Sequence, residues 1–186
     1  MPASTLCPKL APLCRYLDSL TARMDLSILE QVLNENQIGI DDVTDACVYD
    51  EQRYQRNKIG TSPWYDLLVI CWRPGQATAI HDHTSSSCGF KVLTGTATEL
   101  VYEKTDDAGD FVRPVRKGAY ATGQLCLAQD HDIHRISNDS ASENLVTLHI
   151  YSPPLQMKFY EMEPSLQAPG ALSGNTELGR LLSGRR

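Results

Sequence analysis

The sequence has 186 residues, a length that suits one domain with a self-sufficient hydrophobic core. Its 17 basic and 23 acidic residues give a net charge of −6 and a pI near 5.3, and no basic stripe interleaved with aromatics occurs, so nucleic acid is not an expected partner. The longest apolar stretch, 67–72, is far too short for a membrane span, and prolines interrupt the first residues where a signal peptide would need an apolar core. We therefore expect a cytoplasmic protein that does not associate with membranes and, by default, a monomer.

Six cysteines are scattered without a CxxC pair or a regular spacing. In a chain with enough core to fold without disulfides, they are expected to remain thiols. Cys71 and Cys126 lie inside apolar runs, where a cysteine ordinarily acts as a small buried hydrophobe. The others are Cys7, Cys14, Cys47 and Cys88.

The first 48 residues are predicted to be a helical flank. Leu10, Leu13, Leu17 and Leu20 fall at helical spacing, and Asp25 opens a second amphipathic stretch. Two or three short helices are therefore expected beside the rest of the fold.

From 49 to 158 the pattern changes to short β-rich runs separated by glycines and Asp, Asn and Ser clusters. Such a series predicts a mostly β fold, a double-sheet jelly-roll barrel. Residues 159–186 are expected to be a variable C-terminal tail whose end, from Gly174, is mobile, and the whole chain is expected to form a single domain. The predicted strands are 67–73, 77–83, 88–94, 96–103, 111–116, 124–128, 133–137 and 145–151.

Three histidines indicate a metal site on this barrel. Strand side chains repeat every two residues, so His81 and His83 point to one face, about 7 Å apart at their Cα atoms. His134 lies in another strand-like segment and is the best placed third ligand. Both segments follow the spacing of the two motifs of the cupin superfamily, but Cys88 stands where the first motif usually has glutamate. In the second motif, Gln129 and His131 stand where proline and a second glycine are usual, so that match is looser. The first segment runs from Gly75 to Gly95 and the second from Gly123 to Asn138.

Three neutral imidazoles leave the full charge on a divalent ion and keep coordination positions open. Such a site favours an anionic substrate and leaves room for dioxygen. Fe(II) fits best, because oxygen activation needs a redox metal, although zinc, manganese or nickel could also bind three histidines.

Two further clusters carry polar groups that suit a substrate pocket. Tyr54 and Arg56 share one side of an extended segment, where the guanidinium can grip a carboxylate with two parallel hydrogen bonds; the alternative is a solvated basic stretch. Thr147, His149 and Tyr151 alternate on one predicted strand, where they could form a hydroxyl–imidazole–phenol relay that orients Tyr151 and tunes its acidity. Alternatively, these three are ordinary polar residues of a barrel interior.

With these residues the chain, from about 48 to 158, resembles the cysteine dioxygenases, thiol dioxygenases of the cupin superfamily. The resemblance implies that His81, His83 and His134 hold Fe(II). It also implies that Arg56, helped by Tyr54, binds the substrate carboxylate. The segments that carry it are 52–57, 71–72, 80–84, Cys88, Gly95, 134–135 and 148–154.

The same resemblance places Tyr151 beside the reacting ligands, with His149 supporting it. In relatives of the eukaryotic type, the cysteine and tyrosine that match Cys88 and Tyr151 are joined by an autocatalytic thioether bond, so this crosslink is expected here. Thr147 stands where the relay usually begins with serine, which keeps the hydroxyl. Gly89 stands where many relatives have a bulkier residue.

The implied reaction is the oxidation of the L-cysteine thiolate by O2 to cysteine sulfinic acid. One alternative is a dioxygenase for 3-mercaptopropionate or cysteamine. Relatives that use 3-mercaptopropionate typically lack the arginine, and cysteamine has no carboxylate, so Arg56 favours cysteine. Less favoured are a non-catalytic metal-binding cupin and a zinc or manganese isomerase or hydrolase.

Overall fold

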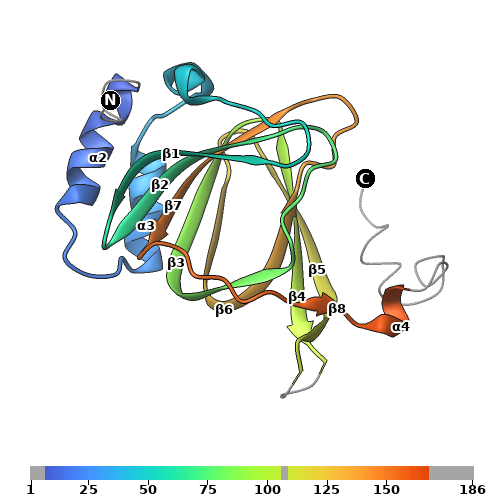
Figure 1. Ribbon diagram of the computed structural model, residues 1–186. Coiled ribbons are helices and arrows are strands. Elements are labelled where there is room, and N and C mark those ends of the chain that lie inside the picture. The colour runs from blue at the N-terminus through green and yellow to red at the C-terminus, as the bar shows by residue number, and fades with distance from the viewer. Residues whose placement is uncertain (1–6, 106–108, 168–186) are drawn as a thin grey trace.

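The computed structural model describes residues 7–105 and 109–167, and eight strands dominate this part of the chain (Figure 1). The strands form one sheet in the order β1-β2-β7-β3-β6-β4-β5-β8, antiparallel except for the β5–β8 pair. Their bounds are β1 Gln55–Ser62, β2 Tyr65–Trp72, β3 His81–Thr94, β4 Thr96–Lys104, β5 Phe111–Ala121, β6 Leu125–Ser137, β7 Leu145–Ser152 and β8 Glu161–Met162.

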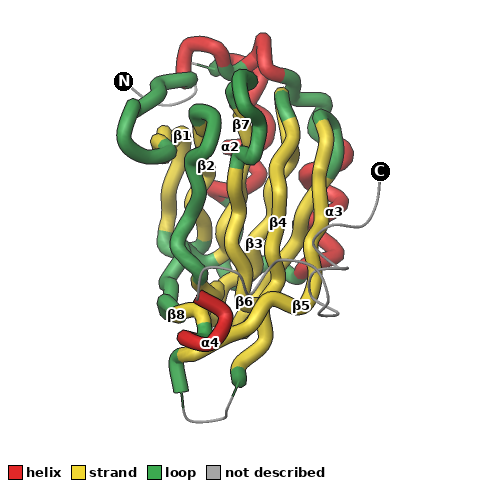
Figure 2. Tube along the Cα trace, turned by 90° about the vertical axis from the view of Figure 1, so that its right-hand side faces the viewer, coloured by secondary structure: helices red, strands yellow, loops and turns green. Residues whose placement is uncertain are grey.

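The sheet curls into a barrel, as Figures 1 and 2 show from two directions. Ile70 and Trp72 on β2 lie in the same buried cluster as Ala97 on β4, although these strands are far apart in the strand order. The predicted mostly β barrel with short N-terminal helices is confirmed.

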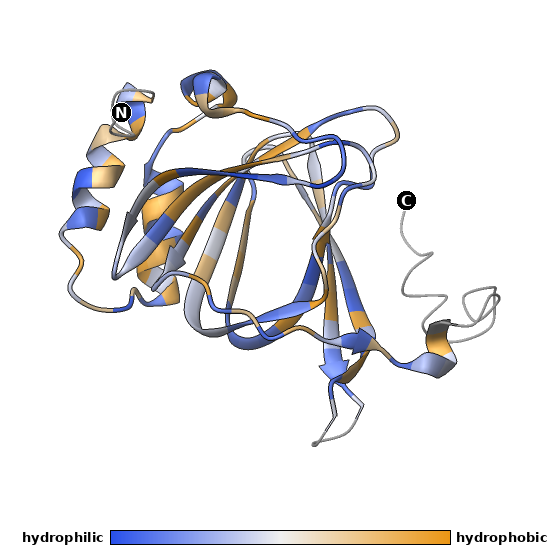
Figure 3. Cartoon of the chain, viewed as in Figure 1, coloured by the Kyte–Doolittle hydropathy of each residue, from blue (hydrophilic) through white to orange (hydrophobic). Residues whose placement is uncertain are grey.

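The helices that precede the barrel cover the outer face of the wall that contains β2, β7 and β3 (Figure 1). Leu10, Leu13 and Leu17 are buried, as their helical spacing predicts. They belong to one apolar cluster with outward-facing residues of β2 such as Leu67 and Val69, so β2 is buried on both faces and reads as a continuous apolar run (Figure 3). The helices are η1 Pro8–Leu10, α2 Ala11–Asp18, α3 Leu26–Glu35, η2 Ile40–Asp42, η3 Thr44–Ala46 and, after the barrel, α4 Pro164–Gln167.

Several predicted strand boundaries are wrong. The expected strands 77–83 and 88–94 form one strand, β3, which begins only at His81, and the expected strands 124–128 and 133–137 form one strand, β6. Polar runs within each suggested turns, but they remain paired through register irregularities, with positive φ at Ser85 (63°) and Asp130 (49°). These bulges bend the ladder without ending it.

Strand β1 was not predicted, because its sequence is polar and does not alternate. It lies at the edge of the sheet, where pairing with β2 supplies the backbone hydrogen bonds and few side chains need burial. This strand positions Arg56.

The first residues of the expected tail are part of the fold. Residues 161–162 form β8 beside β5, and α4 follows. The predicted mobile end, 174–186, lies outside the described residues. Within the described ranges, no helix has both the length and the apolar character that crossing a membrane requires.

Gly89 allows α3 to approach β3 closely. A Cβ at this position would lie 2.8 Å from Leu127, 2.9 Å from Leu33 and 3.1 Å from Leu29, all nearer than ordinary van der Waals contact. We expect Gly89→Ala to lower the free energy of unfolding by about 1–3 kcal/mol, the usual cost of overpacking, measured by urea denaturation.

The matched control is Gly118→Ala on β5. The nearest atom to a Cβ there is the tip of Arg116 at 3.3 Å, which can move aside. Equal losses in the two variants would contradict the close-packing argument.

Candidate active site

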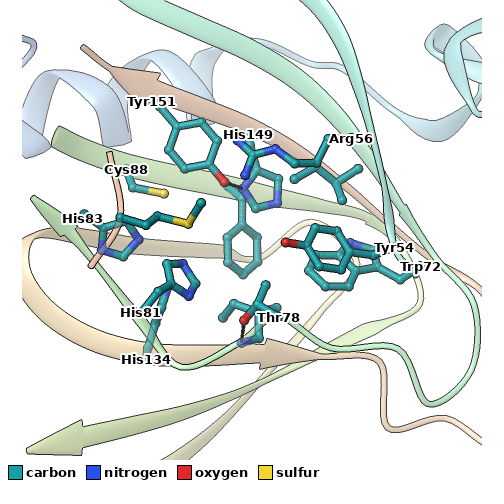
Figure 4. Close-up of a pocket in the computed structure, with 14 residues that line it drawn as sticks. Tyr54, Arg56, Trp72, Thr78, His81, His83, Cys88, His134, His149 and Tyr151 are labelled. Atoms are coloured by element: carbon teal, nitrogen blue, oxygen red, sulfur yellow. Dashed lines mark hydrogen bonds between the residues drawn. The ribbon is translucent and has the colours of Figure 1, made fainter. Parts of the chain in front are cut away.

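His81, His83 and His134 converge on one end of the barrel interior (Figure 4). His81 is paired with His134 across β3 and β6, and His83 follows two residues later on the same face. Their ring centroids are 4.6 to 5.4 Å apart, and one ligand atom from each lies within 4.8 Å of the others. All three are buried, so the group predicted from sequence forms a compact nitrogen-donor set that can hold a metal ion.

The hydrogen-bonding pattern of His81 and His83 leaves a ring nitrogen lone pair on each available to bind an ion. Nδ1 of His81 lies 3.0 Å from the carbonyl oxygen of Ala79, which can only accept, so Nδ1 carries the proton and Nε2 is free. Neither ring nitrogen of His83 has a hydrogen-bond partner in the described part of the chain. Such a buried orphan imidazole is costly unless it has a ligand. The residues therefore fit a bound metal.

Burial keeps the rings of His81 and His83 neutral at pH 7. Burial and then the neighbouring His134 lower the pKa of His81 to about 4, and burial followed by the other two rings lowers that of His83 to about 3. Neutral imidazole is the form that ligates metals.

Glu99 on β4 holds the third histidine and was missed by the sequence analysis. His134 Nδ1 donates to Glu99 Oε1 over 2.9 Å, Cys126 donates to the same oxygen, and Tyr120 and Arg116 donate to Oε2 over 2.9 and 3.1 Å. Burial alone would raise the pKa of Glu99, but the hydrogen bonds from His134, Tyr120 and Cys126 lower it to about 2. An ionised carboxylate on Nδ1 orients the ring and makes Nε2 more basic.

Thr147, His149 and Tyr151 form the predicted hydrogen-bonded chain on β7. Thr147 Oγ1 lies 2.8 Å from His149 Nε2, and Tyr151 Oη lies 3.1 Å from Nδ1. Trp72 Nε1 donates to Thr147 Oγ1, which favours donation by that hydroxyl to Nε2. Nδ1–H of His149 then donates to the phenol oxygen, which leaves the Tyr151 proton free to face the pocket.

The relay orients Tyr151 rather than making it acidic. Burial raises the pKa of the Tyr151 phenol well above its ordinary value, and burial also lowers that of His149 well below its own. The phenol therefore keeps its proton near neutral pH.

Cys88 on β3 is directly opposite Tyr151 in the β3–β7 register, so both side chains are on the pocket face. Figure 4 shows the thiol and the phenol at the same end of the pocket. Burial raises the pKa of the Cys88 thiol, which is 4% exposed as a residue.

Arg56 and Tyr54 lie across the pocket from the histidines (Figure 4). The Arg56 guanidinium carbon is 5.3 Å from the centre of the Tyr151 ring, within cation–π range, and the Tyr54 ring stacks on Trp72 at 4.5 Å. Within the described ranges, Arg56 has no acidic partner, so its charge is available to a ligand.

All nine residues named from the sequence are thus in this region, and eight of them line one pocket; Thr147 lies behind it, bonded to His149. The lining residues that were not predicted as site residues come from several parts of the chain: Ile70, Trp72, Thr78, Phe90, Ile136 and Met157.

The fold and the site define a cupin barrel with a three-histidine metal group. An uncharacterised Klebsiella pneumoniae protein with a double-stranded β-helix domain superposes with a TM-score of 0.54 at 16% identity, over 68% of this chain and 93% of that one, which shows the fold alone.

The family model for cysteine dioxygenase type I matches residues 2–162, and the chain belongs to this family of thiol dioxygenases, which are oxidoreductases. It is 31% identical to Homo sapiens cysteine dioxygenase type 1 over 150 residues, covering 78% of this chain and 74% of the human one. The Danio rerio protein of the same name is 28% identical over 154 residues, covering 70% and 74%.

Replacing Glu99 by glutamine should weaken metal binding by about 10- to 100-fold, the usual effect of losing a carboxylate that orients a metal-ligating histidine. The measurement is anaerobic competition for Fe(II) between the protein and a coloured chelator, with the melting temperature of the metal-free protein as a check of folding.

Tyr120→Phe is the matched control, because it removes one donor to Glu99 and leaves the His134 contact in place. A Glu99→Gln protein that folds and binds Fe(II) as tightly as the parent would refute the positioning role.

Proposed function

We propose that this chain oxidises L-cysteine with O2 to cysteine sulfinic acid, at a mononuclear Fe(II) held by His81, His83 and His134. The observation that carries the proposal is the placement of Arg56, which has no acidic partner among the described residues, in the same pocket as the three-histidine group. The relatives named cysteine dioxygenase type 1 support the choice of substrate.

The reaction needs no external reductant. The sulfur of the thiol loses four electrons, O2 gains four, and both oxygen atoms end on sulfur, while the thiol hydrogen becomes the acidic hydrogen of the sulfinic acid. The bound ion supplies redox chemistry towards O2 and a positive charge that favours the thiolate.

The side chains of the pocket divide the work of binding and orientation. Arg56 binds the carboxylate of the substrate by charge-assisted hydrogen bonds, with the Tyr54 hydroxyl beside it. His149 holds the Tyr151 phenol so that its proton points towards the reacting sulfur and stabilises the negative charge that develops on oxygen. The apolar residues Trp72 and Phe90 limit the entry of water.

We also propose that the chain acts as one domain, a monomer in the cytoplasm. All six cysteines are free, which fits a reducing compartment. Size-exclusion chromatography with light scattering tests the monomer directly.

Oxygen uptake by the Fe(II)-loaded protein should be fastest with L-cysteine when L-cysteine, 3-mercaptopropionate and cysteamine are compared, and mass spectrometry should identify cysteine sulfinate. The zinc-loaded protein is the control and should consume no oxygen. Preference for another thiol would overturn the substrate assignment, and no uptake with any thiol would return the chain to the metal-binding alternative.

Arg56→Ala should lower kcat/KM for L-cysteine by about tenfold to more than a hundredfold, because it removes a charge-assisted contact of about 1.5–3 kcal/mol. Arg56→Lys should fall in between, since an ammonium is a point charge without the planar fork. An unchanged kcat/KM in Arg56→Ala would exclude the carboxylate role.

A thioether between Cys88 Sγ and the Tyr151 ring carbon next to the hydroxyl is expected to form during turnover. The bond replaces the thiol hydrogen and one ring hydrogen, and O2 accepts the two electrons and two protons released, giving hydrogen peroxide. Peptide mass spectrometry should find a joined peptide that has lost two hydrogens.

Cys88→Ser and Tyr151→Phe should abolish this product. Cys71→Ala removes a thiol that packs in the apolar cluster between β2 and the N-terminal helices, away from Tyr151, and should still give the joined peptide. Absence of the joined peptide after many turnovers of the parent would refute the crosslink.

A further inference from the structure

The chain that leaves β7 runs beside the start of β3 and contributes a residue to the pocket before it reaches β8. We name residues 153–160 the strap. Met157, on the strap, is half-buried and lines the pocket together with the three histidines, Cys88 and Arg56. The strap therefore contributes a side chain to a site that is otherwise built from the barrel.

Asp82 anchors the strap. The Lys158 amide donates to Asp82 Oδ1 over 3.0 Å, and the Tyr160 hydroxyl donates to Oδ2 over 2.8 Å. The Asp82 amide also donates to the Lys158 carbonyl, and the Tyr160 amide to that of Ile80, both over 3.0 Å. At the other end of the strap, Ser86 Oγ donates to the Pro153 carbonyl over 2.6 Å.

Asp82 can do this because it lies between two residues of the three-histidine group. Strand side chains alternate, so His81 and His83 face the pocket while Asp82 faces away from it. The Asp82 carboxylate is 2% exposed as a residue and accepts two further bonds from Thr84. The central residue of the histidine motif thus ties the strap to the strand that bears His81 and His83.

The pairing register places Met157 at the metal end of the pocket. Phe159 forms an antiparallel bridge with His81, so Lys158 lies opposite Asp82 and Met157 falls opposite His83. Directly opposite residues share a face, which agrees with Met157 and His83 lining the same pocket.

We propose that Met157 sets the upper size limit for the thiol substrate, and that Asp82 positions it by holding the strap. The inference rests on the proposed thiol oxidation and adds to it the residue that excludes thiols longer than L-cysteine. A substrate held at one end by Arg56 and at the other near the histidines is confined along its length, so one extra methylene must displace the Met157 side chain. The structure assigns this role to a residue outside the barrel strands.

Homocysteine, which is L-cysteine lengthened by one methylene, is the probe. One methylene is worth about 10- to 200-fold in discrimination, so Met157→Ala should raise the ratio of kcat/KM for homocysteine to that for L-cysteine by about tenfold or more. Met157→Leu, which keeps a side chain of similar volume, should restore the parent ratio. Gln156→Ala is the matched control, because Gln156 is the exposed neighbour on the strap and should leave the ratio unchanged.

Substrate affinity measured without turnover is a second test of the size limit. In anaerobic calorimetry on the Fe(II)-loaded protein, Met157→Ala should lower the Kd for homocysteine by about tenfold and change that for L-cysteine less. If the parent oxidises L-cysteine but neither the ratio nor the Kd moves in Met157→Ala, the size-limit proposal fails alone. If the parent oxidises no thiol, the proposed function fails instead.

Tyr160→Phe tests the anchor at a residue that does not line the pocket. Removing its hydroxyl should speed amide hydrogen exchange across the strap and shift the homocysteine ratio in the same direction as Met157→Ala, by a smaller factor. Faster exchange with an unchanged ratio would overturn the positioning role of Asp82.

Discussion

The position of β3 between β6 and β7 is the constraint on which the rest of the site depends. Pairing with β6 places His81 opposite His134, and pairing with β7 places Cys88 opposite Tyr151. A slip of one residue in either ladder would turn the affected side chains to the opposite face. The irregularity around Ser85 changes the register between the two halves of β3. The first half carries the metal-binding histidines His81 and His83, and the second half carries Cys88 opposite Tyr151.

Burial then determines how the polar groups are arranged. In a low-dielectric interior each polar atom needs a partner, and nearly every one here has it. Glu99 collects four donors, and the chain from Trp72 through Thr147 and His149 ends at Tyr151. Among the described residues that line the pocket, His83 is the one whose buried polar atoms have no hydrogen-bond partner, and a metal ion would supply one.

Much of the site could be predicted because it depends on local alternation. The spacing of His81 and His83 places both on one face whatever the strand boundaries, and the same holds for the polar residues of β7. The strand ends were predicted less well, because bulges let polar runs stay paired within β3 and β6.

The residues that sequence reasoning missed act over long sequence separations. Glu99 reads as an ordinary charged residue in an alternating strand, and only the pairing of β4 with β6, which places Val101 opposite His134, brings it to that ring. Asp82 binds the strap, and Met157 lies on it, and the strap returns to β3 about seventy-five residues after Asp82 in the sequence. The one local hint was Gly89, a small residue where a larger one is usual, and its reason is the leucines of α3.

Because Gly89 has no side chain, only the backbone of β3 separates the pocket from the leucines of α3. Cys88 and Phe90 face inwards while the backbone between them rests directly on Leu29 and Leu33. Substitutions on the buried face of α3 can therefore move Cys88 relative to Tyr151 without altering any residue that touches a ligand. The helical flank therefore supports the β3 backbone behind the pocket. Substitutions in it are a route by which related chains could change the geometry of the same pocket.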